Sequence, residues 1–70
     1  MDIKREDLQS IEDRVSHYEI ISPIFTHKGR GVVVTAKYVN QTLMVIGHSF
    51  VDAVRKMNHL LDTYEEANLP

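Results

Sequence analysis

The chain has no cysteine and no tryptophan, and only three glycines and two prolines among its 70 residues. The lack of cysteine excludes disulfide bonds and thiolate metal sites, and it leaves the redox compartment open. The longest apolar runs are far shorter than the roughly 20 residues that cross a bilayer. The charged start MDIKREDLQS is unlike a signal peptide. We therefore expect no membrane association and, by default, a cytoplasmic location.

The chain carries ten acidic and eight basic residues, a formal net charge of −2, and 43% hydrophobic residues. This balance is typical of a globular chain and predicts one small domain over residues 1–70. Residues 19–49 carry one acid and three bases, so the middle of the chain is basic between two acidic ends. That asymmetry is far weaker than the basic excess of a dedicated nucleic-acid binder.

Two amphipathic helices are predicted, one over about residues 3–17 and one over about residues 50–65, because apolar residues recur there at spacings of three and four. The first stripe consists of Leu8, Ile11, Val15 and Tyr18. The second, wider stripe consists of Phe50, Val54, Met57, Leu61 and Tyr64. Ser49 and Asp52 have the spacing of a capping box at the start of the second helix.

Segments rich in β-branched residues predict three strands, over about residues 19–26, 32–39 and 42–47. Pro23 cannot donate a hydrogen bond to a neighbouring strand, so the first strand lies at an edge or carries a bulge. Gly29 and Gly31 permit a tight turn, and Asn40-Gln41 is a second turn. The sequence therefore predicts an α+β fold of order α-β-β-β-α, with a three-stranded antiparallel meander packed against helices.

A turn at Asn40-Gln41 pairs Tyr38 with Leu43, and pairing Thr26 with Gly31 aligns the first hairpin. Because side chains alternate along a strand, this register assigns each residue to one face of the sheet. The predicted inner face consists of Ile21, Phe25, Val32, Val34, Ala36, Tyr38, Leu43 and Val45. The predicted outer face consists of Ile20, Ile24, Val33, Thr35, Lys37, Val39, Met44 and Ile46.

Six of the eight residues predicted on the outer face are apolar, although an exposed face should be mostly polar. An apolar patch of this kind marks an interface. Either the first helix covers part of the face, or a second copy or another protein does. The candidate protein interface consists of Ile20, Ile24, Val33, Val39, Met44 and Ile46.

The loop THKGRG over residues 26–31 joins the first two strands and combines flexible glycines with permanent cations. One interpretation is a nucleic-acid contact, with Lys28 and Arg30 on phosphates, His27 reaching a groove, and Lys37 adding a further cation. The other is a simple hairpin turn whose charges keep the tip in water. Two cations at the tip release few counterions, which favours the turn.

The predicted order of elements, with a histidine in the loop between the first two strands, resembles the double-stranded RNA-binding domain in outline. The resemblance covers nearly the whole chain and implies an RNA contact at His27. In that family a lysine cluster at the start of the second helix grips phosphates. Here residues 49–52 read SFVD, and the first helix is net acidic. The resemblance therefore implies a fold outline, while RNA binding by the family's lysines is not expected.

Chemistry-bearing motifs are scarce in this sequence. The four histidines lack the i, i+4 spacing of paired helical metal ligands, and there is no HExxH motif. The paired carboxylates fall on solvent-facing helix positions, where acid–base catalysis is hard to arrange. We expect no enzyme activity, no metal and no cofactor.

The leading hypothesis is a small, non-enzymatic protein-binding or regulatory module that forms a homodimer, contacts another protein, or does both. Small proteins of phages and mobile elements often work in this way. The alternative is a nucleic-acid-binding protein that uses the loop over residues 27–31.

Overall fold

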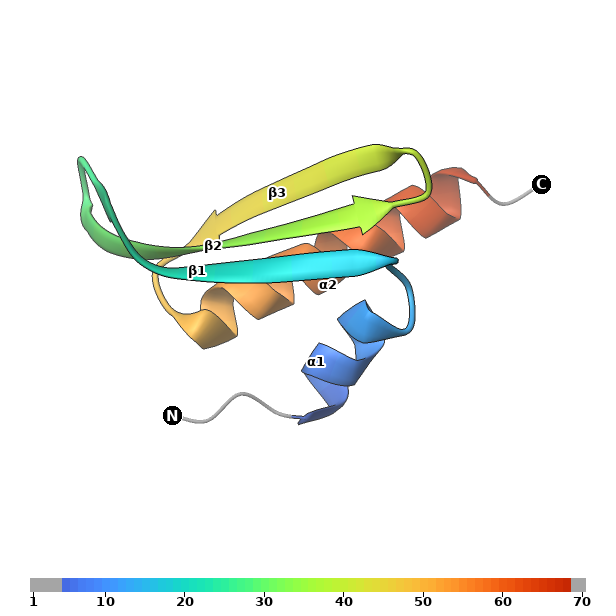
Figure 1. Cartoon of the computed structure of the whole chain (residues 1–70), viewed down its shortest axis with the longest axis horizontal. Helices are drawn as coiled ribbons and strands as arrows, with labels where there is room; N and C mark the ends of the chain where they lie inside the picture. The colour runs from blue at the N-terminus through green and yellow to red at the C-terminus, as the bar shows by residue number, and fades with distance from the viewer. Residues whose placement is uncertain (1–4, 69–70) are drawn as a thin grey trace.

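The computed structural model describes residues 5–68 and shows a helix, a three-stranded antiparallel sheet and a second helix, in that order, within this range (Figure 1). The elements are α1 (Arg5–Glu12), β1 (His17–Thr26), β2 (Gly29–Tyr38), β3 (Gln41–Gly47) and α2 (Phe50–Ala67). The strands lie side by side in the order β1-β2-β3. The predicted α+β class and α-β-β-β-α order are confirmed.

The hairpin between β2 and β3 turns at Val39 and Asn40, one residue earlier than predicted. Tyr38 pairs with Gln41, and Ala36 pairs with Leu43. The pairing differs from the predicted one by two residues. An even shift leaves every side chain on its original face of the sheet, because side chains alternate with a period of two. The facing predicted for β2 and β3 is therefore right although the register is wrong.

A bulge in β1 reverses the predicted facing of the part of the strand that precedes it. Ile21 pairs with Val33 and Ile24 with Gly31, and the register shifts between these two pairs, at the cis peptide Ser22-Pro23. The bulge on an edge strand agrees with the expectation from proline. Its consequence was not predicted, because an odd offset moves side chains to the opposite face.

Ile20 and Ile21 therefore lie on the faces opposite to the predicted ones, whereas Phe25 keeps its predicted face but lies away from the core. Ile21 and Phe25, predicted on the inner face, are 45% and 78% exposed. Ile20, predicted on the outer face, pairs with Val34 and packs against the core.

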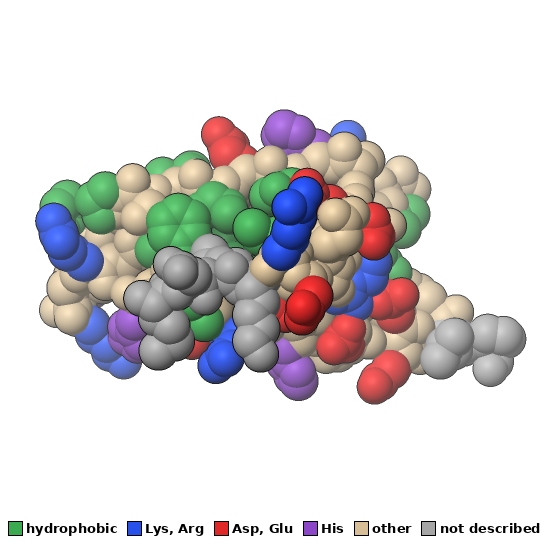
Figure 2. Space-filling model, turned by 90° about the horizontal axis from the view of Figure 1, so that it is seen from below, with side chains coloured by type: hydrophobic (Ala, Val, Ile, Leu, Met, Phe, Trp, Pro, Cys, Tyr) green, Lys and Arg blue, Asp and Glu red, His purple; other side chains and the backbone are tan. Residues whose placement is uncertain are grey.

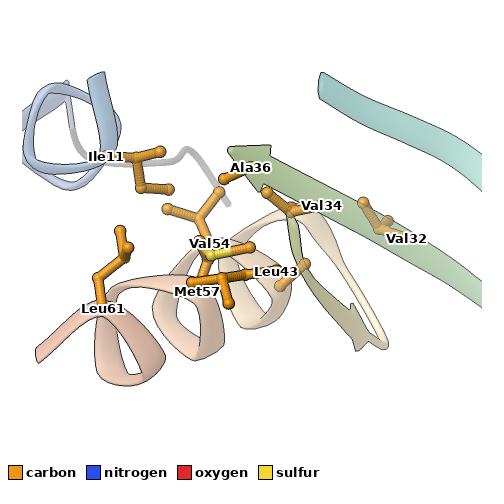
Figure 3. Packing of buried hydrophobic residues seen from close by; sticks show 9 residues of the cluster. Ile11, Val32, Val34, Ala36, Leu43, Val54, Met57 and Leu61 are labelled. Atoms are coloured by element: carbon orange, nitrogen blue, oxygen red, sulfur yellow. The ribbon is translucent and has the colours of Figure 1, made fainter. Parts of the chain in front are cut away.

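Both helices cover the same face of the sheet (Figure 1). Ile11 of α1 and Leu61 of α2 belong to one buried cluster with Val34 of the central strand. Figure 3 shows these side chains pointing toward one another from their separate elements. The interpretation in which the first helix covers the outer face is therefore wrong.

The core is a single apolar layer between the helices and the inner face of the sheet. Its members are Ile11, Val32, Val34, Ala36, Leu43, Ala53, Val54, Met57 and Leu61. Among the described residues, no polar or charged side chain is buried. Burying an aliphatic side chain of this size contributes about 1.5–3 kcal/mol, so α2, with four buried residues, is the main stabilising helix.

α1 ends at Glu12 and not at about residue 17; its expected start near residue 3 lies outside the described residues. Two backbone hydrogen bonds to the carbonyl of Ile11, from Arg14 and Val15, close the end of the helix. The chain then enters β1, where Tyr18 is paired with β2. Val15 and Tyr18 still pack against the core, although they do so from a turn and a strand.

Candidate functional site

The face of the sheet opposite the helices carries a cluster of apolar side chains. We call it the open sheet face, and it consists of Ile21, Ile24, Val33, Met44 and Ile46. Ile21, Val33 and Ile46 form one row across the three strands, since Val33 pairs with both of the others. Met44 and Ile46 are 61% and 46% exposed. Val33, on the central strand, is buried, with 9% of its surface exposed.

Ile24 belongs to the open sheet face by its position opposite Gly31. A Cβ built on Gly31 would lie 3.4 Å from Cγ1 of Ile24, so both point to the same side. Gly31 and Val33 are two residues apart on β2 and share that side. Ile24 is half-buried and does not belong to the residues that pack against the core.

The remainder of this side of the sheet is polar. Lys37 pairs with His17 and Thr42 next to the second turn, and Thr35 pairs with Glu19. The charged side chains Glu19 and Lys37 have opposite signs. The open sheet face is therefore an apolar area with a mixed polar border at one end.

The structure brings together four of the six residues of the predicted interface. Ile24, Val33, Met44 and Ile46 lie on the open sheet face, which also contains Ile21, missed by the prediction because of the bulge. Ile20 belongs to the core, as described above. Val39 lies in the second turn, where it is 70% exposed with a positive φ of 55°.

A second surface lies where the β1–β2 hairpin meets the junction between β3 and α2. We call it the basic hollow, and it has a volume of about 340 Å³. Its walls are formed by Thr26, His27, Lys28, Arg30, Gly31, Ile46, Gly47, His48 and Lys56. Of the residues that the structure describes, none of those lining this hollow is acidic. With neutral histidines, the lining carries three positive charges.

The tip of the hairpin is a tight turn at His27 and Lys28. The Thr26 hydroxyl accepts a hydrogen bond from the backbone of Lys28 at 3.2 Å and donates to the carbonyl of Gly29 at 3.0 Å. Gly29 has a φ of 114°, which residues with a side chain rarely adopt. This local sequence therefore fixes the wall of the hollow that carries Lys28 and Arg30.

The opposite wall is fixed by the start of α2. Ser49 is the N-cap, and its hydroxyl accepts from the backbone N–H of Asp52 at 3.2 Å. The Asp52 carboxylate in turn accepts from the backbone N–H of His48 at 2.9 Å, as in a capping box. Gly47 has no room for a Cβ, which would lie 2.5 Å from the backbone nitrogen of Ala53. β3 therefore meets α2 at van der Waals distance.

Lys56 is held at the edge of the hollow by two partners. Its ammonium lies 3.2 Å from the carbonyl oxygen of Ile46 and 3.2 Å from Oδ2 of Asp52. The pKa of Asp52 lies below its ordinary value of 3.8, first because of the hydrogen bond from His48 and next because of Lys56. The carboxylate is charged at neutral pH, and this keeps Lys56 in place.

The predicted nucleic-acid residues divide between two places. His27, Lys28 and Arg30 lie together in the basic hollow, whereas Lys37 lies near the second turn, at the other end of the sheet. His48 and Lys56 were not predicted as members of this group. Their positions in the sequence gave no signal, since the contact with the hairpin arises only when the helix docks under the sheet.

Charge is distributed unevenly over the molecule. Figure 2 shows basic and histidine side chains at the end that carries the hairpin, and most of the acidic side chains toward the other end. The acids of α1 and of the C-terminal half of α2 account for this second end. The basic hollow therefore has a positive local environment in a chain whose net charge is −2.

Two further hollows are lined mainly by residues of the helices. The larger of these, about 580 Å³, is lined by residues of α1 and by Asp13, which follows it. A third hollow is lined by the first residues of α2 and Ser49. Within residues 5–68 there is no group of three histidine or carboxylate side chains placed to hold a metal ion.

Neither α1 nor α2 combines the length and the apolar character that crossing a membrane requires. No protein-family model, curated protein or solved structure matches the chain.

Proposed function

We propose that this chain is a non-enzymatic binding module that forms a homodimer through the open sheet face. The observation that carries the proposal is the exposure of Ile21, Met44 and Ile46 on a face that neither helix covers. Clusters of large apolar side chains on a protein surface commonly serve as interaction sites. A face-to-face dimer removes these side chains from water and leaves the helices on the outside.

The charge of the face favours a second copy as the occupant. The charged residues on this side of the sheet, Glu19 and Lys37, have opposite signs, so two copies can meet without net repulsion. A partner that bound by charge complementarity would require a face with one dominant sign.

The size of the face predicts a dimer of modest affinity. Strands are about 4.8 Å apart and rise about 3.3 Å per residue, so three strands of seven residues cover roughly 300 Å² in projection. A stable complex buries about 800 Å² on each partner. The β1–β2 hairpin bends away from the helices and adds surface on the same side (Figure 1). We therefore expect dissociation within an accessible range of concentration.

The test is the native mass measured by light scattering over a dilution series. The chain has a mass of 8.1 kDa, and we expect the average mass to rise toward twice that value as concentration increases. Met44→Glu places a charge on the face and should keep the protein monomeric at every concentration.

Val39→Glu is the matched control, because Val39 is also apolar and highly exposed but lies in the turn outside the face. It should associate like the natural chain. A constant mass near 8 kDa for the natural chain, or equal association of the Met44→Glu variant, would overturn the proposal.

A further inference from the structure

We propose that the basic hollow binds the phosphate of a nucleotide, with the ring of Phe25 as the platform for its base. The first support is the composition of the hollow. Lys28, Arg30 and Lys56 come from two separate parts of the chain and line one concave volume. Lys56 is paired with the carboxylate of Asp52, which lies outside the lining, whereas Lys28 and Arg30 form no ion pair among the described residues. Together these cations form an environment that selects for anions.

The second support is the hydrogen-bonding capacity of Lys56. A lysine ammonium has three donors and no acceptor. Among the described residues, Ile46 and Asp52 take up two of these donors. The third donor remains for a ligand, and the two existing contacts hold the ammonium in position before a ligand arrives. Such preorganisation lowers the entropy lost on binding.

The third support is the location of Phe25, which is the most exposed large hydrophobic side chain within residues 5–68. Phe25 pairs directly with Arg30 in the hairpin, so both side chains point to the same face of it. Arg30 in turn lines the hollow. An aromatic ring beside cations is the arrangement by which proteins stack a base while they neutralise its phosphate.

Phe25 also has no explanation in the packing of the monomer. It lies outside the set of residues packed against the core, and β1 places it beyond the bulge. A ring that is 78% exposed contributes little to folding, while its apolar surface remains available to a planar ligand.

The site does not depend on the dimer. The open sheet face and the hollow share Ile46 alone, and Met44 lies outside the hollow. The monomeric Met44→Glu variant should therefore still bind nucleotide. Loss of the dimer and loss of nucleotide binding are thus separate results.

The experiment follows the backbone amide signals of the full chain by NMR during titration with three probes. The probes are inorganic phosphate, adenosine monophosphate and a 15-nucleotide oligothymidylate. We expect saturable shifts at Gly31, Gly47 and His48 with the two nucleotide probes, and weaker binding of inorganic phosphate because it has no base to stack. Saturable shifts elsewhere on the chain, or none with either nucleotide probe, would overturn the proposal.

Two variants test the phosphate contacts. Arg30→Ala combined with Lys56→Ala should weaken binding of adenosine monophosphate about tenfold or more, because charged hydrogen bonds are lost. Lys37→Ala combined with Arg55→Ala removes the same number of charges outside the hollow and should bind like the natural chain. Equal weakening by both pairs would show nonspecific attraction and overturn the site.

Phe25→Ala tests the stacking platform. It should weaken nucleotide binding and leave the binding of inorganic phosphate unchanged. If it changes neither, the role of Phe25 is wrong.

The oligonucleotide distinguishes a free nucleotide from a single strand. A single nucleic-acid strand that fills the site binds more tightly than the monophosphate. The logarithm of its binding constant falls with the logarithm of the salt concentration, with a slope of roughly −2 for three phosphate contacts. Equal affinity for the two probes identifies the free nucleotide as the ligand.

Discussion

Nη2 of Arg14 donates a hydrogen bond to Oδ1 of Asn58 over 2.7 Å and thereby joins the end of α1 to the middle of α2. The same guanidinium also donates to the carbonyl and hydroxyl of Ser10. Asn58 completes the link by donating to the carbonyl of Asp7 at 3.0 Å. Arg14 is only 17% exposed, so these bonds are largely shielded from water.

Two carboxylates of α2, Asp62 and Glu65, also contact Arg14, each at 2.5 Å. Burial by itself lowers the pKa of the Arg14 guanidinium, but the hydrogen bonds that it donates to Glu65 and Asp62, together with their charges, raise the pKa above its ordinary value. Arg14 is therefore charged at neutral pH. It fixes the short α1 on the same side of the sheet as α2.

Arg14→Ala should lower the free energy of unfolding by about 1–3 kcal/mol, because it leaves Asn58 without a donor and removes several charged hydrogen bonds. The carboxylates contribute little to this loss, since exposed ion pairs are worth less than about 1 kcal/mol. Urea denaturation followed by circular dichroism measures the change. Arg55→Ala removes an exposed arginine from α2 and should have almost no effect; equal effects would contradict the structural role of Arg14.

The two faces of the sheet predict opposite results for two methionines. Met57 is fully buried on the helix side, so Met57→Ala should cost about 2–5 kcal/mol. Met44 is 61% exposed on the open sheet face, and Met44→Ala should cost less than about 1 kcal/mol in the monomer. Chemical denaturation at low protein concentration compares them. A large loss with Met44→Ala in the monomer would mean that this face is packed within a single chain.

The capping interaction of Asp52 should make stability depend on pH. Because its pKa is lower in the folded protein than the ordinary 3.8, the charged form stabilises the fold above about that pH. The contribution is lost as the pH falls through the folded pKa. Asp52→Asn keeps an acceptor for His48 but loses the charge. It should therefore be less stable than the natural chain at pH 7, and the difference should shrink below pH 4.

Denaturation curves collected between pH 7 and pH 2 test this dependence. Glu66→Gln, an exposed substitution near the other end of α2, is the control for the loss of one charge and should not reduce stability at pH 7. A difference for Asp52→Asn that persisted unchanged at pH 2 would exclude the charge as its cause.

The turn at Val39 is a point where stability can be gained. A β-branched residue with a φ of 55° is strained by roughly 1–2 kcal/mol, whereas glycine adopts this conformation freely. After the entropy cost of glycine, Val39→Gly should stabilise the protein by about 0.5–1 kcal/mol. The melting temperature measures the gain. Asn40→Gly, at the next position, should not stabilise the protein; a larger gain there would place the strained residue at Asn40.

The sequence was sufficient to predict the order of the elements, the class of fold and which of the two helices contributes more to the core. These features follow from the spacing of apolar residues along the chain, which can be seen in a single sequence. The face of each residue in β2 and β3 was also correct, because an error of two residues in register preserves alternation. In β1 the bulge introduced an odd offset. Pro23 indicated an irregularity but could not give its size, so Ile20 and Ile21 were assigned to the wrong faces.

The features that depend on contacts between distant residues could not be predicted. Arg14 and Asn58 are 44 positions apart, and nothing in their neighbours indicates that they meet. Lys56 was explained as a partner of Asp52 within one helix, which is correct but incomplete. Its place in the basic hollow depends on the close approach of Gly47 to Ala53, which only the docking of the helix reveals.

Because both helices lie on one side of the sheet, the central strand is covered by a second layer on that side alone. In a chain of this length the buried surface is close to the minimum that sustains a fold without crosslinks. A second copy that binds to the uncovered side of the sheet increases the buried surface. By mass action, the apparent melting temperature then rises with the protein concentration. Cellular abundance would then govern how much of this protein exists in a folded form.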